Sequence, residues 1–149
     1  MRIRKATETD VSACLQIQKQ DHETYWLEND FIAALRNIDV IFLVAEENSK
    51  IIGYVIGYLA PTKRTDCLLS ETRVNIHHRK KGIGTKLVNA FVTEAFKKGA
   101  SVIYAEIEEK HLPFYHDACK FSKSHDWIEV VMRKKTSKNI CDEYKKLIG

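Results

Sequence analysis

Apolar runs separated by short polar breaks are the most regular pattern along the chain, and they predict a mixed α/β order of elements. Residues 40–45 form an apolar run rich in β-branched and aromatic residues, residues 51–59 form its expected partner strand, and the polar stretch 46–50 between them predicts an antiparallel hairpin. Pro61 ends the second run, and a polar loop is expected at residues 62–66. Further strands are expected at residues 3–7, 67–77, 101–107 and 127–132.

Apolar positions three or four residues apart predict helices between these strands. The longest such stripe is formed by Ile83, Leu87, Phe91 and Ala95, and Gly99 follows it as a C-cap. Helices are therefore expected at residues 11–20, from about residue 28, at 82–98, at 112–119 and, as a possible terminal helix, at 136–148.

The segment that joins the strand at 67–77 to the long helix is rich in glycine and positive charge. It reads Arg79-Lys80-Lys81-Gly82-Ile83-Gly84-Thr85. Two glycines one residue apart allow close backbone approach and unusual dihedral angles, and the first turn of a helix carries N–H groups without intrahelical partners. Together with three basic side chains and the Thr85 hydroxyl, these features predict a site for phosphate oxygens.

A plain turn beside a solvated basic surface is the simpler interpretation of the same segment. Its place between a strand and a helix favours the phosphate site. No Gly-x-x-x-x-Gly-Lys-Ser/Thr occurs in the chain, which excludes a P-loop, and Val88 and Asn89 stand where the dinucleotide fingerprint needs a third glycine. A phosphorylated cofactor of another kind is therefore expected.

Composition restricts the remaining choices. The 149 residues are 44% hydrophobic and 30% charged, as is usual for one soluble globular domain. No apolar stretch approaches the roughly 18 residues of a membrane span, and no apolar run follows the basic residues after Met1 as in a secretory signal. The four cysteines form no zinc motif or disulfide framework, so reduced thiols in the cytoplasm are expected.

Two motifs together resemble the GNAT superfamily of N-acetyltransferases. The segment Arg79-x-x-Gly82-x-Gly84, preceded by Thr72-Arg73-Val74, is similar to the acetyl-CoA signature of that family. Downstream, Ala105-Glu106 followed by Leu112-Pro113-Phe114-Tyr115 is similar to its later strand and tyrosine-bearing helix. The likeness covers nearly the whole chain in element order.

The resemblance implies a fold and a co-substrate. The fold would be one mixed α/β domain over residues 1–149, with 136–149 as a possible helical extension, built on a twisted, mostly antiparallel sheet of six to seven strands with helices on both faces. Acetyl-CoA would be the co-substrate, with no metal. Its thioester would lie where strand 67–77 splays from strand 101–107, because unpaired strand amides can donate to the carbonyl oxygen there. The implied coenzyme contacts are Val74, Ile76, Arg79, Lys80, Lys81, Gly82, Ile83, Gly84 and Thr85.

The resemblance assigns Tyr115 to protonation of the departing thiolate. A phenol, with a pKa of about 10, is a proton donor at neutral pH. An aromatic residue on a short helix is more often part of a core, and this alternative stays open. Lys120-Phe121 comes one residue later than the Gly-Phe pair of the family, so a longer or bulged helix is expected here.

Glu71 is the candidate base that deprotonates the amine, directly or through water. It stands three residues before Val74, where many members of the resembled family carry an acid. Pairing with a neighbour such as Arg73 on a sheet face is the alternative. No activating dyad lies near Cys119 in the sequence, which argues against an acyl-enzyme. Weaker candidates for proton transfer are Glu106, Glu108, His111 and His116.

Acidic and aromatic residues alternate between the first two predicted helices, in the region that borders the acceptor in proteins of this type. The set suits a cationic amine and comprises Asp21, Glu23, Tyr25, Trp26, Glu28 and Asp30. We therefore predict acetyl transfer from acetyl-CoA to a primary amine by direct attack in a ternary complex.

The acceptor could be a small-molecule amine, a polyamine or a protein amine, and a homodimer is possible. A non-catalytic acyl-CoA-binding regulatory domain is the main alternative. A nucleic-acid-binding module ranks lower, because the basic runs lack interleaved aromatic residues and a recognised motif. No nucleic acid or membrane partner is expected.

Overall fold

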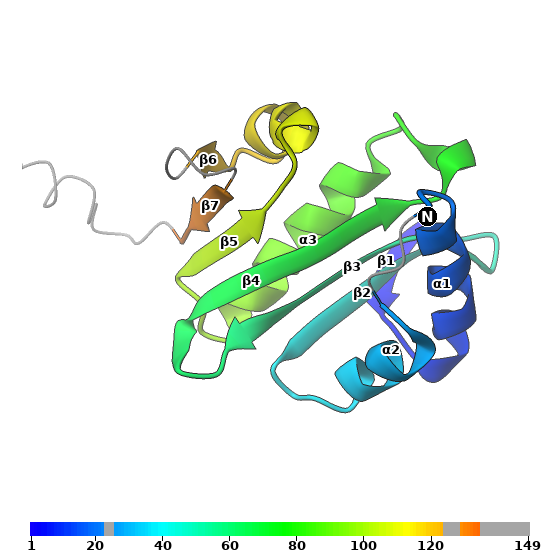
Figure 1. Ribbon diagram of the computed structural model, residues 1–149, viewed down its shortest axis with the longest axis horizontal. Helices are drawn as coiled ribbons and strands as arrows, with labels where there is room; N and C mark the ends of the chain where they lie inside the picture. Colours follow the sequence, from blue (N-terminus) through cyan, green and yellow to red (C-terminus); the bar gives the residue numbers. More distant parts are fainter. Residues whose placement is uncertain (23–25, 124–128, 135–149) are drawn as a thin grey trace, which may run out of the picture.

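A seven-stranded sheet forms the centre of the molecule (Figure 1). The computed structural model describes residues 1–22, 26–123 and 129–134. The strands lie in the order β1-β2-β3-β4-β5-β7-β6, and all neighbours are antiparallel except β4 and β5. They are β1 (Arg2–Lys5), β2 (Val40–Glu47), β3 (Lys50–Ala60), β4 (Lys63–Val74), β5 (Val102–Glu106), β6 (Ser122–Lys123) and β7 (Glu129–Arg133). The predicted mixed α/β class and mostly antiparallel sheet are confirmed.

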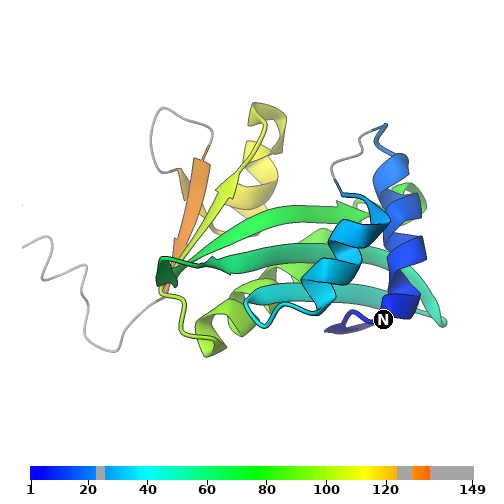
Figure 2. The ribbon, with the colours of Figure 1, turned by 60° about the horizontal axis from the view of Figure 1, so that its bottom comes forward.

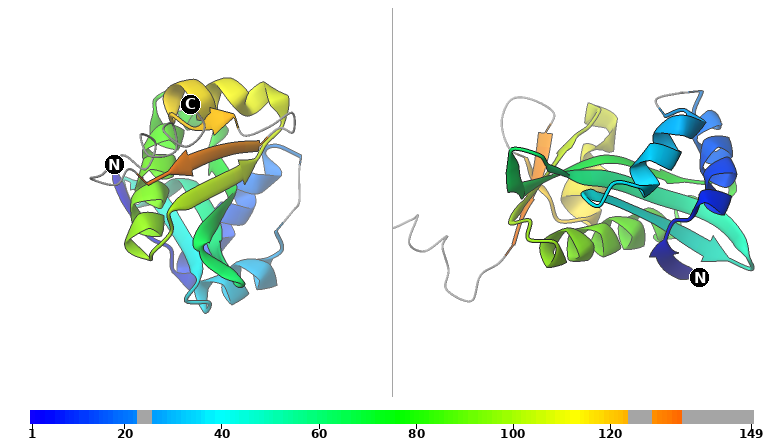
Figure 3. Two further views of the ribbon diagram at one scale, coloured as in Figure 1. Left: turned by 90° about the vertical axis from the view of Figure 1, so that its left-hand side faces the viewer. Right: turned by 90° about the horizontal axis from the view of Figure 1, so that it is seen from below.

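Helices cover both faces of this sheet, and α3 lies on the opposite side from α1 and α2 (Figures 2 and 3). Residues Phe31 and Tyr54 belong to the apolar cluster beneath α1 and α2, and Leu87 and Phe91 to the cluster beneath α3. The helices are α1 (Val11–Lys19), α2 (Glu28–Leu35) and α3 (Ile83–Lys97). Shorter turns are η1 (Glu8–Asp10), η2 (Ile76–His78), η3 (Glu109–His111) and the π-helical η4 (Phe114–Ala118).

The strand β4 begins earlier than the sequence predicted. Ala60 pairs with Lys63, so only Pro61 and Thr62 remain for the turn between β3 and β4. The predicted polar loop at residues 62–66 is therefore wrong from Lys63 onward. The polarity of these residues reflects exposure at the end of a hairpin, where side chains on both faces meet water.

The strand also ends earlier, at Val74 rather than at residue 77. The side chain of Asn75 accepts a hydrogen bond from the His77 N–H (3.0 Å) and caps the turn η2. An Asn side chain that bonds the backbone two residues on favours a turn over a strand. This early end turns the chain toward α3. The turn η2 leads into residues 79–85, where the sequence predicts a phosphate site and which we call the cofactor segment.

The C-terminal part follows the predicted order with local differences. The expected strands at 101–107 and 127–132 correspond to β5 and β7, and the expected helix at 112–119 contains η4. The two-residue strand β6 was not predicted, because two residues carry no detectable periodicity. The predicted terminal helix at 136–148 lies outside the described residues.

Candidate active site

The parallel strands β4 and β5 separate partway along their length (Figure 1). Their last pair is Leu68 with Tyr104, although β4 continues to Val74 and β5 to Glu106. The N–H of Asn75 donates to Ile52 O of β3 (2.8 Å). Because backbone groups of successive strand residues point to opposite edges, the N–H and C=O of Val74 point to the edge that β5 has left. The predicted splay is present.

One extra residue in β4 decides which side chains face each side of the sheet. The register with β3 shifts at Ser70, which has no partner, as in a β-bulge. Before the bulge, Leu69 belongs to the apolar cluster beneath α3. After it, Thr72 lies opposite a residue of that cluster, whereas Glu71 and Arg73 lie opposite residues of the cluster beneath α1 and α2. The bulge thus turns two charged residues toward α1.

The cofactor segment presents free backbone donors at the start of α3. Gly82 is the N-cap and has a φ of +80°, in the left-handed region that favours glycine. The helical ladder starts with the bond from Lys86 N–H to Gly82 O (3.1 Å). The N–H groups that precede this ladder, and so have no partner within the helix, are those of Ile83, Gly84 and Thr85. Lys80 and Lys81 are exposed beside them.

The two glycines of the segment have different roles. A Cβ at Gly82 would meet no atom within 4 Å, so this position needs glycine for its backbone angle alone. A Cβ at Gly84 would lie 3.2 Å from ring carbons of Phe114. The second glycine therefore allows the first turn of α3 to pack closely on the turn that carries Tyr115.

Two predicted coenzyme contacts, Arg79 and Ile76, are engaged by the end of α1. The Arg79 guanidinium donates from Nε to Val74 O (2.9 Å) and from NH2 to Asp21 Oδ1 (2.7 Å). The Ile76 N–H donates to Gln20 Oε1 (2.9 Å). The structure therefore brings the predicted coenzyme residues together and adds Gln20 and Asp21, which no local sequence signal connects with this segment.

Tyr115 lies on the α3 side of the sheet and is only 7% exposed. Its ring makes edge contacts with Phe114 and Phe121, at centroid distances of 4.9 and 5.7 Å. Burial raises the pKa of Tyr115 to about 12, and the nearby Thr72 hydroxyl lowers it in part. The buried Thr72 Oγ1 has no hydrogen-bond partner among the described residues. Tyr115 is thus a core ring whose hydroxyl lies beside an unpaired polar atom.

The turn that carries Tyr115 is π-helical. The N–H of Cys119 donates to Phe114 O (3.0 Å), so this turn holds one residue more than an α-helical turn. Lys120 then adopts a φ of +62°, and Phe121 N–H donates to Tyr115 O (2.9 Å). The predicted bulge is confirmed, and Phe121 still packs against Tyr115 although it comes one residue late.

Glu71 lies on the opposite side of the sheet and is 8% exposed. Its Oε1 accepts hydrogen bonds from the Tyr54 hydroxyl (2.6 Å) and from Arg73 Nε. Burial, followed by the Glu71 charge, raises the pKa of Tyr54, so this phenol stays a donor. The pairing with Arg73, which was the alternative interpretation of Glu71, is therefore present, and Arg73 NH1 continues to Asp21 Oδ2 (2.8 Å).

The weaker candidates are mostly exposed. Glu106 and His111 are at the surface, Glu108 lies 3.2 Å from Lys110 Nζ, and His116 lies 2.8 Å from Asp117. Burial raises the pKa of Cys119 to about 11, which opposes a nucleophilic thiolate.

The acids expected on the acceptor side are dispersed. Asp30 Oδ2 accepts from Leu27 N–H (2.8 Å) at the start of α2, and Glu23 and Tyr25 lie outside the described residues.

In residues 1–22, 26–123 and 129–134, no helix is long and apolar enough to cross a lipid bilayer, and no cluster of metal-ligating side chains occurs.

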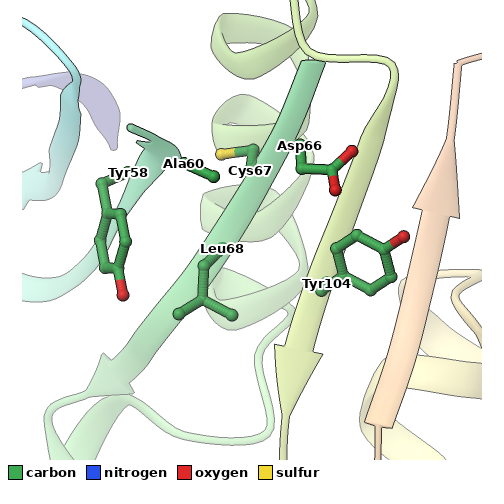
Figure 4. Close-up of a pocket in the computed structure, with 6 residues that line it drawn as sticks. All are labelled: Tyr58, Ala60, Asp66, Cys67, Leu68 and Tyr104. Atoms are coloured by element: carbon green, nitrogen blue, oxygen red, sulfur yellow. The ribbon is translucent and has the colours of Figure 1, made fainter. Parts of the chain in front are cut away.

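A shallow pocket of about 320 Å³ lies at the foot of the splay (Figure 4). The rings of Tyr58 and Tyr104 stand on either side of Leu68, on the side of the sheet that faces away from α3. Asp66 lies at one end of the pocket. No local sequence signal predicted this pocket, because its walls come from three strands that lie side by side only in the folded sheet.

Comparisons with known proteins converge on the same segments. The model of the acetyltransferase (GNAT) family matches residues 6–121, which include β4, the cofactor segment and the turn with Tyr115. The uncharacterized N-acetyltransferase YhfO of Bacillus subtilis (strain 168) is 30% identical over 118 residues, which cover 72% of this chain and 79% of the relative.

Solved structures share the fold at low identity. The PaiA N-acetyltransferase of Thermoplasma acidophilum, in complex with coenzyme A, is 16% identical with a TM-score of 0.71 and covers 91% of this chain and 98% of that one. The acetyltransferase yncA of Salmonella typhimurium, with its cofactor acetyl-CoA, is 20% identical with a TM-score of 0.76 over 91% and 95%. Because the family model spans most of the chain and the sheet agrees with these structures, the resemblance seen in the motifs is confirmed: the chain belongs to the acetyltransferase (GNAT) family.

Proposed function

We propose that the protein is an acetyl-CoA-dependent N-acetyltransferase that acts on a primary amine by direct attack in a ternary complex. The observation that carries this proposal is the placement of a proton donor and a carboxylate on opposite sides of one strand edge. Tyr115 lies on the α3 side and Glu71 on the α1 side. The backbone groups of Val74 point to the unpaired edge between them.

The cofactor segment fits the diphosphate of coenzyme A. The N–H groups of Ile83, Gly84 and Thr85 lie at the positive end of the α3 dipole, with Lys80 and Lys81 exposed beside them. The Thr72 hydroxyl lies near the Tyr115 hydroxyl and offers a polar contact for the other end of the molecule. The structural neighbours that hold coenzyme A or acetyl-CoA support this assignment by analogy.

Bound acetyl-CoA would supply a thioester carbonyl carbon for attack by the amine. The Val74 N–H would donate to the carbonyl oxygen as negative charge develops. Glu71 would accept the proton that the amine loses, and Tyr115 would donate to the sulfur as the C–S bond breaks. Because the Tyr115 pKa of about 12 lies above the value of about 8.5 for a thiol, Tyr115 would stabilise the thiolate by a hydrogen bond, and solvent would supply the final proton.

The acceptor would approach from the side of α1 and α2. The pocket between Tyr58 and Tyr104 opens on that side, at the last β4–β5 pair before the splay. Its aromatic walls suit the aliphatic part of an amine, and Asp66 adds a negative charge at one end. Small amines, polyamines and protein amines all meet these requirements.

An acceptor screen tests the proposal. The purified protein is incubated with acetyl-CoA and a panel of small amines, polyamines and peptides, and free thiol is followed together with the mass of the amine product. We expect amine-dependent thiol release above the rate with acetyl-CoA alone. Calorimetric binding of acetyl-CoA without release for any amine would instead favour the non-catalytic acyl-CoA-binding alternative. The absence of binding heat at millimolar acetyl-CoA would refute both.

A further inference from the structure

Four charged side chains form an alternating row from the interior of the sheet to the cofactor segment. Glu71 pairs with Arg73 Nε, and Arg73 NH1 donates to Asp21 Oδ2 (2.8 Å). The other oxygen of Asp21 accepts from Arg79 NH2 (2.7 Å). A single carboxylate, just beyond the end of α1, therefore holds one arginine with each of its oxygens.

The row becomes more exposed toward the cofactor segment. The side chains of Glu71 and Arg73 are 8% and 9% exposed, whereas those of Asp21 and Arg79 are 28% and 38% exposed. Burial would raise the pKa of Asp21, but the hydrogen bonds from Arg79 and Arg73 outweigh it and hold this pKa below its ordinary value. Asp21 is therefore a charged link between an accessible guanidinium and a buried ion pair.

We infer that Asp21 is a positioning residue that links occupancy of the cofactor segment to the availability of Glu71 as a base. The inference rests on the proposed function. A diphosphate at the segment competes with Asp21 for Arg79, because one guanidinium cannot pair fully with both anions. Asp21 is then left to Arg73, whose partners include both Asp21 and Glu71. A stronger Arg73–Asp21 pair loosens Arg73 from Glu71.

The functional consequence is an order of events. Glu71 is held by Arg73 while the segment is empty and becomes a better proton acceptor once the coenzyme is bound. The amine is then deprotonated only when an acetyl donor is present. A second contact ties the same elements together, since the Ile76 N–H donates to Gln20 Oε1 and attaches the end of α1 to the turn before the segment.

Nuclear magnetic resonance of arginine side chains tests this link without turnover. In wild-type protein, saturating coenzyme A should shift the Nε–H resonance of Arg73. In Asp21→Asn, coenzyme A should still bind, but the Arg73 resonance should stay in place. Because Asp21 competes with the diphosphate for Arg79, its loss should lower the Kd for coenzyme A roughly two- to five-fold. This factor corresponds to the usual free energy of a partly exposed ion pair. The kcat with a reactive amine should fall about ten-fold, because Asp21 no longer draws Arg73 away from Glu71.

Asp39→Asn is the matched control. Asp39 also pairs with an arginine, Arg64 (2.7 Å), and its side chain is 25% exposed, but it lies outside the row. This variant should match wild type in coenzyme affinity, kcat and the Arg73 shift. Asp21→Glu keeps the carboxylate and should restore the shift. If Asp21→Asn does not fold, the wild-type measurement decides, because an Arg73 resonance that stays in place while coenzyme A binds would overturn the link.

Two outcomes separate the inference from the proposed function. An equal Arg73 shift in wild type and Asp21→Asn, with coenzyme bound to both by calorimetry, would overturn the link and leave the acetyltransferase proposal intact. No binding of coenzyme A to wild type would refute the proposed function, and the link with it.

Discussion

Near the splay, β4 presents uncharged groups toward α3 and charged groups toward α1. On the α3 side, Tyr115 lies beside the Thr72 hydroxyl among apolar rings. On the α1 side, Glu71 accepts from Tyr54 and Arg73, and Arg73 continues to Asp21. Both sides are largely buried.

The difference shows how a buried phenol and a buried carboxylate can lie on the two sides of one strand. A phenol needs only burial to remain protonated, because a low-dielectric environment disfavours its charged form. A buried carboxylate needs partners to remain charged, and the guanidinium and hydroxyl around Glu71 provide them. The bulge at Ser70 assigns each residue to the side that has the matching environment.

Tyr115→Phe should remove the donor on the α3 side alone. The ring remains, so folding and coenzyme affinity should be retained, whereas kcat should fall about 10²-fold through loss of the hydrogen bond to the developing thiolate. Steady-state kinetics and calorimetry check both parts. Tyr54→Phe removes the hydroxyl on the other side and should cost about 1 kcal/mol of stability with a smaller loss of kcat. Equal effects of the two variants on kcat would contradict the assignment of Tyr115.

Glu71→Gln should affect the α1 side. An amide keeps the shape and can accept from Tyr54 and Arg73 but is a very weak proton acceptor, so kcat should fall at least ten-fold for an amine that is protonated at neutral pH. Glu106→Gln, at an exposed position near the end of β5, is the control and should retain activity. Unchanged kinetics of Glu71→Gln would indicate that Glu71 serves only the ion pair with Arg73.

Stability should fall at both ends of the pH scale, through buried groups in alkali and through Asp21 in acid. The pKa of Tyr115 is raised from 10 to about 12, so its stabilising contribution is complete below pH 10 and is lost as the pH rises toward 12. The pKa of Cys119 is raised from 9 to about 11, so its stabilising contribution is lost as the pH rises from 9 toward 11. The pKa of Asp21 is lowered, so its contribution is present above pH 3.8 and is lost as the pH falls below that value.

Urea unfolding at pH 3, 8 and 10.5 measures these losses. We expect a maximum of stability near pH 8, and each buried group on the α3 side should account for on the order of 1–2 kcal/mol in alkali. In Tyr115→Phe the alkaline fall should be shallower, and in Asp21→Asn the acid fall should be shallower. A stability that does not change between pH 8 and 10.5 would contradict the burial of these hydroxyl and thiol groups.

The smallest expected effect concerns the segment that both sides share. Gly82→Ala and Gly99→Ala each place a side chain at a positive φ with no atom nearby, so each should cost about 1 kcal/mol of stability. Only Gly82→Ala should weaken coenzyme binding, by about ten-fold, because only Gly82 shapes the start of α3. Equal coenzyme affinities of the two variants would argue against the segment as the diphosphate site.

Much of this architecture could be predicted because its signals are local. The apolar runs at residues 40–45 and 51–59 and the stripe from Ile83 to Ala95 report directly on burial. The late position of Phe121 was enough to predict a bulged helix. Periodicity and spacing can be detected within a single element, and each of these features involves one element only.

The features that depend on pairing between elements could not be predicted. Ser70 has no glycine or proline beside it, and its bulge exists only relative to β3. Asp21 is 52 residues from Arg73 and 58 from Arg79, so the sequence suggested only an acid near the acceptor. The pocket between Tyr58 and Tyr104 likewise needs three strands in register.

The wide turn at Phe114–Ala118 has a practical consequence for comparing relatives by sequence. The additional residue in this turn is accommodated by a hydrogen bond that spans five residues instead of four. The strands β5 before the turn and β7 after it therefore stay paired. An alignment that opens its gap ahead of the turn would move His116 into the column of Tyr115, the proposed donor to the leaving thiolate. The gap belongs between Tyr115 and Phe121, because the wide turn holds the additional residue.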